Sequence, residues 1–170
     1  MNNKGYSLLE AIIIVVILGV IAGFMMTSSG LLDGRRTKAC ADNISSLLEK
    51  VRATNLGKDE VTINIYEDTG KGIKADIVTK VKAKNPSDPD KLSRVTEDVG
   101  NDNLEISYST DLSGSSPILL GSGSMEFSFN RSTGSVKNTT PAGIKCIIVR
   151  RGTAEKKIKI YTETGKVSVE

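Results

Sequence analysis

The chain has 170 residues and carries 23 basic and 20 acidic side chains, which leaves a net charge of +3. This near balance argues against nucleic-acid binding over the whole surface, although it leaves room for a local basic patch. The sequence contains no histidine, the commonest general base and a frequent metal ligand. We therefore expect a protein that is not an enzyme and that needs no cofactor or metal.

The first predicted element is an apolar helix near the N-terminus. From Ala11 to Met26 the chain has no charged residue, and the stretch from Tyr6 would extend roughly 31 Å as a helix, enough to cross a bilayer. Glu10 interrupts this stretch, although an ionised group at membrane depth costs about 2.5–3.5 kcal/mol. The pattern predicts a membrane-spanning helix over residues 6–29 and indicates that Glu10 has a function.

The opening residues Lys4-Gly5-Tyr6-Ser7-Leu8-Leu9-Glu10 resemble the processing signature of type IV prepilins. In that family a basic leader ends in glycine, an aromatic residue begins the mature chain, and glutamate is its fifth residue. The resemblance implies that residues 1–5 are a leader, which a prepilin peptidase removes between Gly5 and Tyr6 on the cytoplasmic side. It also implies that the amine of Tyr6 becomes methylated and that the apolar helix packs in the core of a filament.

Glu10 gains a physical role from this resemblance. Cleavage would place a cationic amine on Tyr6, and Glu10 of one subunit could then lie against the Tyr6 amine of its neighbour. An unpaired charge is strongly disfavoured in an apolar medium, so this pairing would select one axial register between subunits. The alternative is that Glu10 lies near the membrane interface and extends to water.

Two glycines of the apolar helix also bear on assembly. Gly19 and Gly23 form a G-x-x-x-G pattern, which permits close approach of two helices or, alternatively, softens one helix locally. Many major pilins carry a proline near the end of this segment, where the present chain has Thr27. The departure favours a minor pilin or a pseudopilin over a major pilin.

The residues beyond the apolar segment predict a second, amphipathic half of the same helix. Apolar side chains recur there at helical spacing, and Gly57 is a natural end because glycine favours the residue after a helix. We expect residues 30–57 to clamp a globular domain formed by residues 58–170. The predicted stripe comprises Cys40, Ile44, Leu47, Leu48 and Val51.

From residue 58 onward the pattern is that of short β-strands separated by loops rich in Gly, Ser and Pro. About eight strands at this spacing predict an α+β fold, in which the long N-terminal helix packs on an antiparallel β-sandwich or a strongly bent sheet. The clearest strands are predicted over residues 61–67, 74–83, 104–109, 125–130 and 144–151, and a final hairpin is predicted over residues 156–170.

Two motifs in the second half of the chain carry a further resemblance. The patterns F-x-F-N-x-x-x-G-x-V, from Phe127 to Val136, and K-I-x-I-Y-x-x-x-G-K-V, from Lys157 to Val167, look like the last strands of the H-type pseudopilin of type II secretion. Minor pilins of type IV pili share that domain. The resemblance implies an extracellular β-rich domain attached to the filament helix.

The remaining polar and sulfur-bearing residues suggest few sites. A disulfide between Cys40 and Cys146 would tie the helix to a strand, and the alternative is two buried thiols. The acidic residues Asp98, Asp102 and Glu105 match no calcium-loop spacing, so we expect a solvated loop there.

A basic stretch near the C-terminus raises an alternative function. Some minor pilins of this type capture DNA, and a basic strand edge could contact phosphates. The simpler interpretation is a charged edge that resists aggregation. The candidate DNA-binding residues are Arg150, Arg151, Lys156, Lys157 and Lys159.

Together these features predict a structural subunit of a type IV pilus or of a pseudopilus of the type II secretion kind. Its expected partners are other pilin or pseudopilin subunits, a prepilin peptidase and a membrane assembly platform. The expected location is the cytoplasmic membrane, crossed once with the C-terminal domain outside, and then the filament. The alternatives are a DNA-binding minor pilin for DNA uptake and a membrane-anchored domain that never polymerises.

Overall fold

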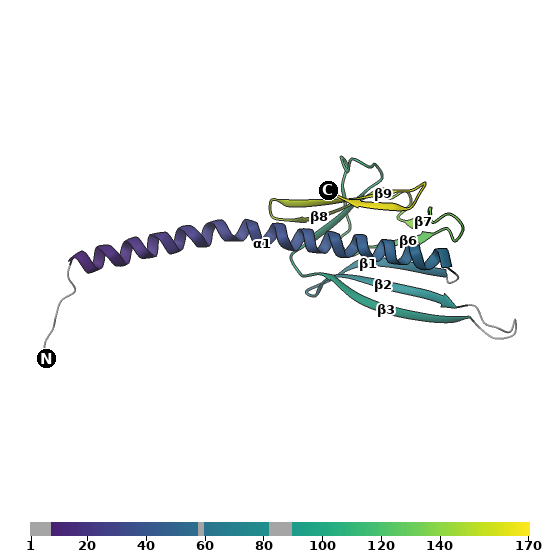
Figure 1. Cartoon of the computed structure of the whole chain (residues 1–170), viewed down its shortest axis with the longest axis horizontal. Coiled ribbons are helices and arrows are strands. Elements are labelled where there is room, and N and C mark those ends of the chain that lie inside the picture. Colours follow the sequence, from purple (N-terminus) through teal and green to yellow (C-terminus); the bar gives the residue numbers. More distant parts are fainter. Residues whose placement is uncertain (1–7, 58–59, 82–89) are drawn as a thin grey trace.

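The computed structural model describes residues 8–57, 60–81 and 90–170, together with all of their side chains except those of 24–29, 31 and 57. A long helix, α1, joins a β-rich domain through its C-terminal half, and its N-terminal half extends away from that domain (Figure 1). The candidate processing residues Gly5 and Tyr6 lie outside the described residues.

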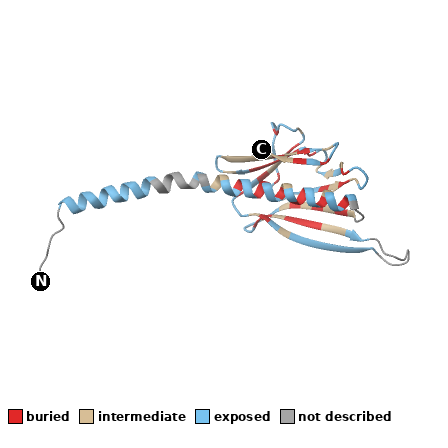
Figure 2. Ribbon diagram, viewed as in Figure 1, coloured by how far each residue is buried: buried red, intermediate tan, exposed pale blue. Residues whose placement is uncertain are grey.

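Helix α1 (Leu8–Gly57) changes character along its length. Over residues 8–23 every side chain is exposed, whereas the part beyond Thr37 presents a buried stripe to the domain (Figure 2). The predicted stripe is confirmed, because Cys40, Ile44 and Leu48 are at most 1% exposed and the other two members are also buried. The stripe attaches the helix to the domain by removing apolar surface from water.

The β-domain contains two antiparallel sheets of five strands each. In the first sheet the spatial order is β3 (Lys91–Gly100), β2 (Gly72–Val81), β1 (Glu60–Asp68), β6 (Ser124–Phe129) and β7 (Val136–Thr140). In the second sheet the order is β10 (Lys166–Val169), β9 (Ala154–Tyr161), β8 (Cys146–Arg151), β4 (Glu105–Ser109) and β5 (Ile118–Leu119).

The fold class predicted from the sequence was wrong in its β architecture. The ten strands form two separate sheets and not one bent sheet, and α1 contacts strands of both sheets, including β1 and β3 in the first and β8, β9 and β10 in the second. The two sheets therefore do not form a sandwich by themselves. The buried stripe of the helix supplies part of the surface against which each sheet packs. The chain remains α+β overall.

One core joins the helix to both sheets. Alternate residues of β1 contribute Val61, Ile63 and Ile65, and alternate residues of β8 contribute Ile147 and Val149, all at most 2% exposed. Burial of every second residue is expected for a strand with one face in the core. The helix stripe belongs to the same cluster, so the attachment of α1 and the folding of the sheets depend on the same contacts.

Asn55 fixes the point where α1 ends and β1 begins. Its buried side chain donates from Nδ2 to the Val61 carbonyl at 2.7 Å, and its Oδ1 accepts from the Val61 amide at 3.0 Å. The side-chain amide of Asn55 thus satisfies both backbone hydrogen-bonding groups of Val61, as the backbone of a neighbouring strand would. Buried backbone groups are costly when unpaired, so this contact stabilises the turn back from the helix.

The glycines of the two resemblance motifs meet in space. Gly134 in the β6–β7 turn and Gly165 in the β9–β10 turn both have positive φ angles, of 70° and 66°. The Val136 amide donates to the Thr162 carbonyl at 2.9 Å, and Arg52 Nε of α1 donates to the Gly134 carbonyl at 3.2 Å. A turn from each sheet and the helix therefore converge at this one point.

We predict that Gly165→Ala destabilises the protein by about 3 kcal/mol, because the new Cβ overlaps the Gly134 carbonyl oxygen and the positive φ disfavours any side chain. The matched control is Gly121→Ala, where φ is 55° and a Cβ meets nothing within 4 Å, so about 1 kcal/mol is expected. Denaturant unfolding of the full chain in mild detergent measures both. Equal losses would contradict the packing role of Gly165.

Candidate functional site

The candidate functional site is the exposed apolar part of α1, residues 8–23. Its large side chains have exposed fractions between 44% for Ile21 and 81% for Leu8. The exposed residues lie on all sides of the helix and not on one stripe, so the β-domain could not cover them even if it moved. A helix that is apolar all round is stable only inside protein or lipid.

Glu10 is the one acidic residue in the first turn of α1, and it is exposed. The N-terminal end of a helix carries a partial positive charge, which favours a carboxylate there. The structure places Glu10 on the apolar segment itself. Its predicted partner, the Tyr6 amine, lies outside the described residues, so the pairing stays a prediction.

The glycine pair occupies open positions on the same segment. A Cβ added at Gly19 or Gly23 would meet nothing within 4 Å in the isolated chain. The role of these glycines in contacts with another helix stays a prediction. Within the residues described, no helix combines the length and the apolar character needed to cross a bilayer.

An ion pair holds α1 at the edge of the domain where the apolar segment departs. Arg151 Nε donates to Asp33 Oδ1 at 2.7 Å, and the two side chains are only 18% and 27% exposed. Arg151 also reaches the Asp102 carbonyl, at 3.5 Å. Charged hydrogen bonds that are partly shielded from water are stronger than surface ion pairs. This contact fixes the direction in which the apolar segment leaves the domain.

The five candidate DNA-binding cations do not form one patch. Arg150 pairs with Glu155, Arg151 with Asp33, and Lys159 with Glu170 at 2.7 Å. Lys157 donates to the Ser113 carbonyl at 2.9 Å and lies 3.7 Å from Glu155. Neighbouring residues of a strand point to opposite faces, so Arg150 and Arg151 diverge. Carboxylates of the same chain therefore already pair with most of the positive charge that phosphate binding would require.

The two cysteines are free and buried, so the proposed disulfide does not form. Cys40 lies in the core that α1 shares with the sheets, whereas Cys146 lies on the opposite face of β8 from the core residues Ile147 and Val149. Burial raises the pKa of Cys40 to about 12 and also raises that of Cys146. Both are therefore thiols at neutral pH, which is the second alternative drawn from the sequence.

A serine-rich loop covers Cys146. The loop residue Gly114 sits so close that an added Cβ would lie 3.2 Å from Cys146 Sγ and 3.0 Å from Ile148 Cδ1. Asp111 organises this loop, since it accepts from the hydroxyls of Ser109 at 2.8 Å and Ser115 at 3.1 Å. The role of Asp111 was not predicted from the sequence, although the Ser and Asp residues of this loop are a signal for it, because such side chains form hydrogen bonds with nearby loop groups.

Hydrogen bonds from Ser113 and Ser109 hold the pKa of Asp111 well below its usual range. A carboxylate with a lowered pKa stabilises the folded loop fully above the pKa of an unfolded aspartate, about 3.9. That stabilisation is lost as the pH falls through the lower value of the folded state. The loop is therefore expected to stay closed at every pH near neutrality.

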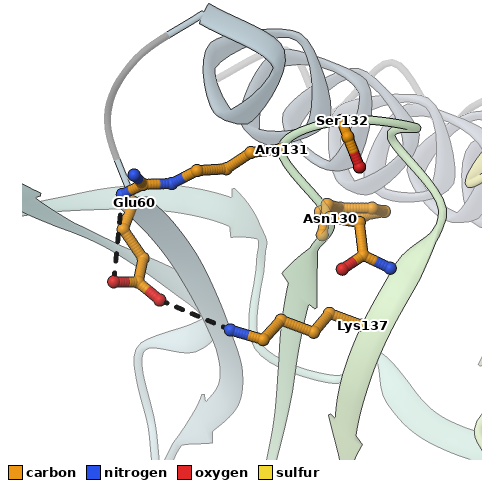
Figure 3. Close-up of a pocket in the computed structure, with 6 residues that line it drawn as sticks. Glu60, Asn130, Arg131, Ser132 and Lys137 are labelled. Atoms are coloured by element: carbon orange, nitrogen blue, oxygen red, sulfur yellow. Dashed lines mark ion pairs between the residues drawn. The ribbon is translucent and has the colours of Figure 1, made fainter.

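A shallow hollow near the end of α1 offers little chemistry. Glu60 lies between Arg131 and Lys137, at 3.9 Å and 3.6 Å from their nitrogens, and the hollow beside them has a volume of about 280 Å³ (Figure 3). These side chains are between 42% and 51% exposed. Exposed ion pairs of this kind contribute little to stability.

The acidic cluster near β3 and β4 does not converge on a metal position. Asp98 is 84% exposed and lies 3.8 Å from Lys74, and Asp102 lies in the turn that follows β3. In the part of the chain that the structure describes, no three His, Cys, Asp or Glu side chains are placed to share a metal ion.

Comparison with known proteins found no match among protein-family models, curated proteins or solved structures.

We predict that Asp111→Asn speeds alkylation of Cys146 roughly tenfold at neutral pH, because the loop loses the charge that its hydroxyl groups bind. Cys40 is an internal reference, since it packs against Gly100 and Leu104 and not against this loop. Mass spectrometry after timed labelling of the folded chain measures both rates. Unchanged labelling of Cys146 would show that Asp111 does not hold the loop closed.

Proposed function

We propose that this chain is a non-enzymatic filament subunit of the type IV pilin-like class, serving as a minor pilin or pseudopilin. The observation that carries the proposal is the apolar segment of α1, which extends uncovered from a folded domain. Such a segment needs another apolar environment, and the opening sequence suggests lipid before assembly and neighbouring helices after it.

The energetic argument follows from exposed area. Burial of apolar surface contributes about 25 cal/mol per Å², so each large aliphatic side chain of the segment contributes roughly 1.5–3 kcal/mol when covered. Leu8, Leu9 and Val15 each have more than two thirds of their surface exposed. Helices of several subunits packed together would remove this surface from water without help from the β-domain.

Glu10 would give this packing a register. Apolar contacts alone allow one helix to slide along another, because they have no preferred direction. A carboxylate in the packed core must find a positive partner, and a processed Tyr6 amine on the adjoining subunit is the group that the sequence offers. The pairing would therefore specify how far each subunit is displaced from the next.

The attachment of α1 to the domain suits a subunit that bears load. The buried stripe holds the C-terminal half of the helix, and the pair between Asp33 and Arg151 holds it near its middle. From Leu8 to Asp33 a continuous helix would extend about 38 Å, at about 1.5 Å per residue. The domain would thus lie outside a core built from the first part of the helix.

The pairing of the basic C-terminal residues with carboxylates weighs against the DNA-binding alternative. A membrane-anchored domain that never polymerises has the same apolar segment but gives no role to Glu10. The two remaining hypotheses are separated by testing Glu10 itself.

We predict that Glu10→Ala is still processed but enters filaments at least about tenfold less than the wild type, because the register-setting charge is absent. Glu49→Ala is the matched control, since Glu49 is an exposed glutamate on the attached half of the same helix. Filaments sheared from cells and quantified against total protein provide the measurement. Undiminished incorporation would overturn the pairing role.

A second prediction concerns processing. Gly5→Trp should leave a full-length precursor in the membrane, because a bulky side chain prevents the extended backbone from entering a narrow protease site. Intact mass of the purified chain shows whether it begins at Tyr6 or at Met1. A wild-type chain that retains Met1 in assembled filaments would contradict the proposed function.

A further inference from the structure

Three cations follow the apolar segment along the same helix. Arg35, Arg36 and Lys38 lie in α1 between the apolar segment and the buried stripe, and all three are exposed. From residue 11 to residue 41 the sequence has one acidic residue, Asp33. The helix is therefore locally basic just beyond its apolar part. We call Arg35, Arg36 and Lys38 the basic collar.

The basic collar is unpaired within the part of the chain that the structure describes. The nearest carboxylate before it, that of Asp33, already binds Arg151 at 2.7 Å. The next carboxylate along the helix, that of Asp42, forms no ion pair with the collar among the described residues. In contrast, Arg150 and Lys159 of the second sheet pair with carboxylates of the same chain. The charge of the collar is thus available to a partner outside the chain.

The collar occupies the faces of α1 that the β-domain leaves open. Successive residues of a helix are turned by about 100°, so Arg35 lies about 180° from the buried Ile44. Arg36 and Lys38 lie on either side of Arg35, about 100° and about 60° away from it. The three side chains thus surround the open side of the helix, as a ring of headgroups would require where a helix leaves a bilayer.

The collar also lies near the headgroup layer when the apolar segment is in a bilayer. Arg35 follows Met26, the last residue of the apolar run, by nine residues, which is about 14 Å of helix. The headgroup layer takes up roughly 5–8 Å of this distance, because a bilayer is about 40–45 Å thick around a hydrocarbon core of about 30 Å. Side chains of a helix point back towards its N-terminus, so the Arg35 guanidinium comes within one screening length, about 8 Å, of the headgroups.

We propose that the basic collar binds the headgroups of anionic phospholipids while the chain is in the membrane. The inference rests on the proposed function and deepens it, because it gives the lipid stage of that function a specific contact. An anionic membrane surface attracts Lys and Arg side chains that lie just beyond an apolar segment. The planar guanidinium of arginine also matches the geometry of a phosphate group.

This contact fixes the position of the β-domain relative to the membrane surface. Asp33 bonds to Arg151 at the edge of the domain from which the apolar segment departs (Figure 1). The collar follows Asp33 directly, so the collar and this edge of the domain face the membrane together. Apolar burial alone has no preferred direction, whereas a ring of bound headgroups limits how far the helix moves into the bilayer.

The test uses the full-length chain reconstituted in membranes of phosphatidylcholine and phosphatidylglycerol in equal parts. Spin-labelled lipid of each kind reports which headgroup is enriched in the layer that touches the protein. We expect the wild type to enrich phosphatidylglycerol about fivefold over phosphatidylcholine. High salt should reduce this preference, because it screens exposed charges. The collar variant, Arg35→Gln with Arg36→Gln and Lys38→Gln, should show no preference.

The matched control removes the same charge from exposed positions of the β-domain, and it should keep the preference of the wild type. Its substitutions are Lys91→Gln, Lys145→Gln and Lys166→Gln. Glutamine forms helices about as readily as arginine and lysine, so the collar variant should keep α1 intact. Thermal unfolding equal to that of the wild type shows that each variant is folded.

Three outcomes would overturn the lipid inference. If the wild type shows no preference, or if the collar variant keeps the preference, the inference fails while the filament proposal stands on the yield of sheared filaments. If the wild type shows no lipid preference but binds duplex DNA and the collar variant does not, nucleic acid is the occupant of the collar. If the folded wild type contacts neither lipid, the lipid stage of the proposed function fails, and the inference fails with it.

Discussion

The proposed function depends on one physical constraint, which is that the apolar segment of α1 is uncovered. Its side chains surround the helix, so no rearrangement of the chain's own β-domain could shield them all. The energetic need for cover must be met by an apolar environment outside the chain's own β-domain. This need makes the β-domain a carrier that holds the segment at a fixed place, through the buried stripe and the ion pair between Asp33 and Arg151.

The β-domain and the attached half of α1 form one folded unit. Two sheets share one core with the helix, and turns from both sheets meet at Gly134 and Gly165 beneath Arg52. Because the helix stripe is part of the core, the helix cannot detach without exposing the inner faces of the sheets. Folding of the domain and retention of the helix therefore depend on the same core contacts.

Ion pairs within the chain neutralise cations on both sheets. Near the C-terminus the cations are paired with carboxylates of the same chain, which makes that edge polar but nearly neutral. Along the first sheet, Lys80 likewise pairs with Asp90 at 3.1 Å and Lys74 with Asp68 at 3.2 Å. Internal pairing of this kind leaves little charge for a partner.

The sequence alone determined the features that have a local period or a local signature. Helical spacing predicted the buried stripe from Cys40 to Val51, and strict alternation predicted β1, because burial follows side-chain direction within one element. The prepilin-like opening comes from the sequence as well, since Gly5 and Tyr6 lie outside the described residues. Strand β3 was not predicted, because most of its side chains are exposed and it lacks an alternating pattern.

Only the tertiary structure decided which elements meet. It separated the strands into two sheets, placed Cys40 and Cys146 on different sides of the second sheet, and paired Arg151 with Asp33 across more than half of the chain. It also brought together two glycines that the sequence presents in unrelated motifs. Each of these contacts joins residues far apart in sequence, and no local pattern encodes such distances, because they are set by how the helix and both sheets share one core.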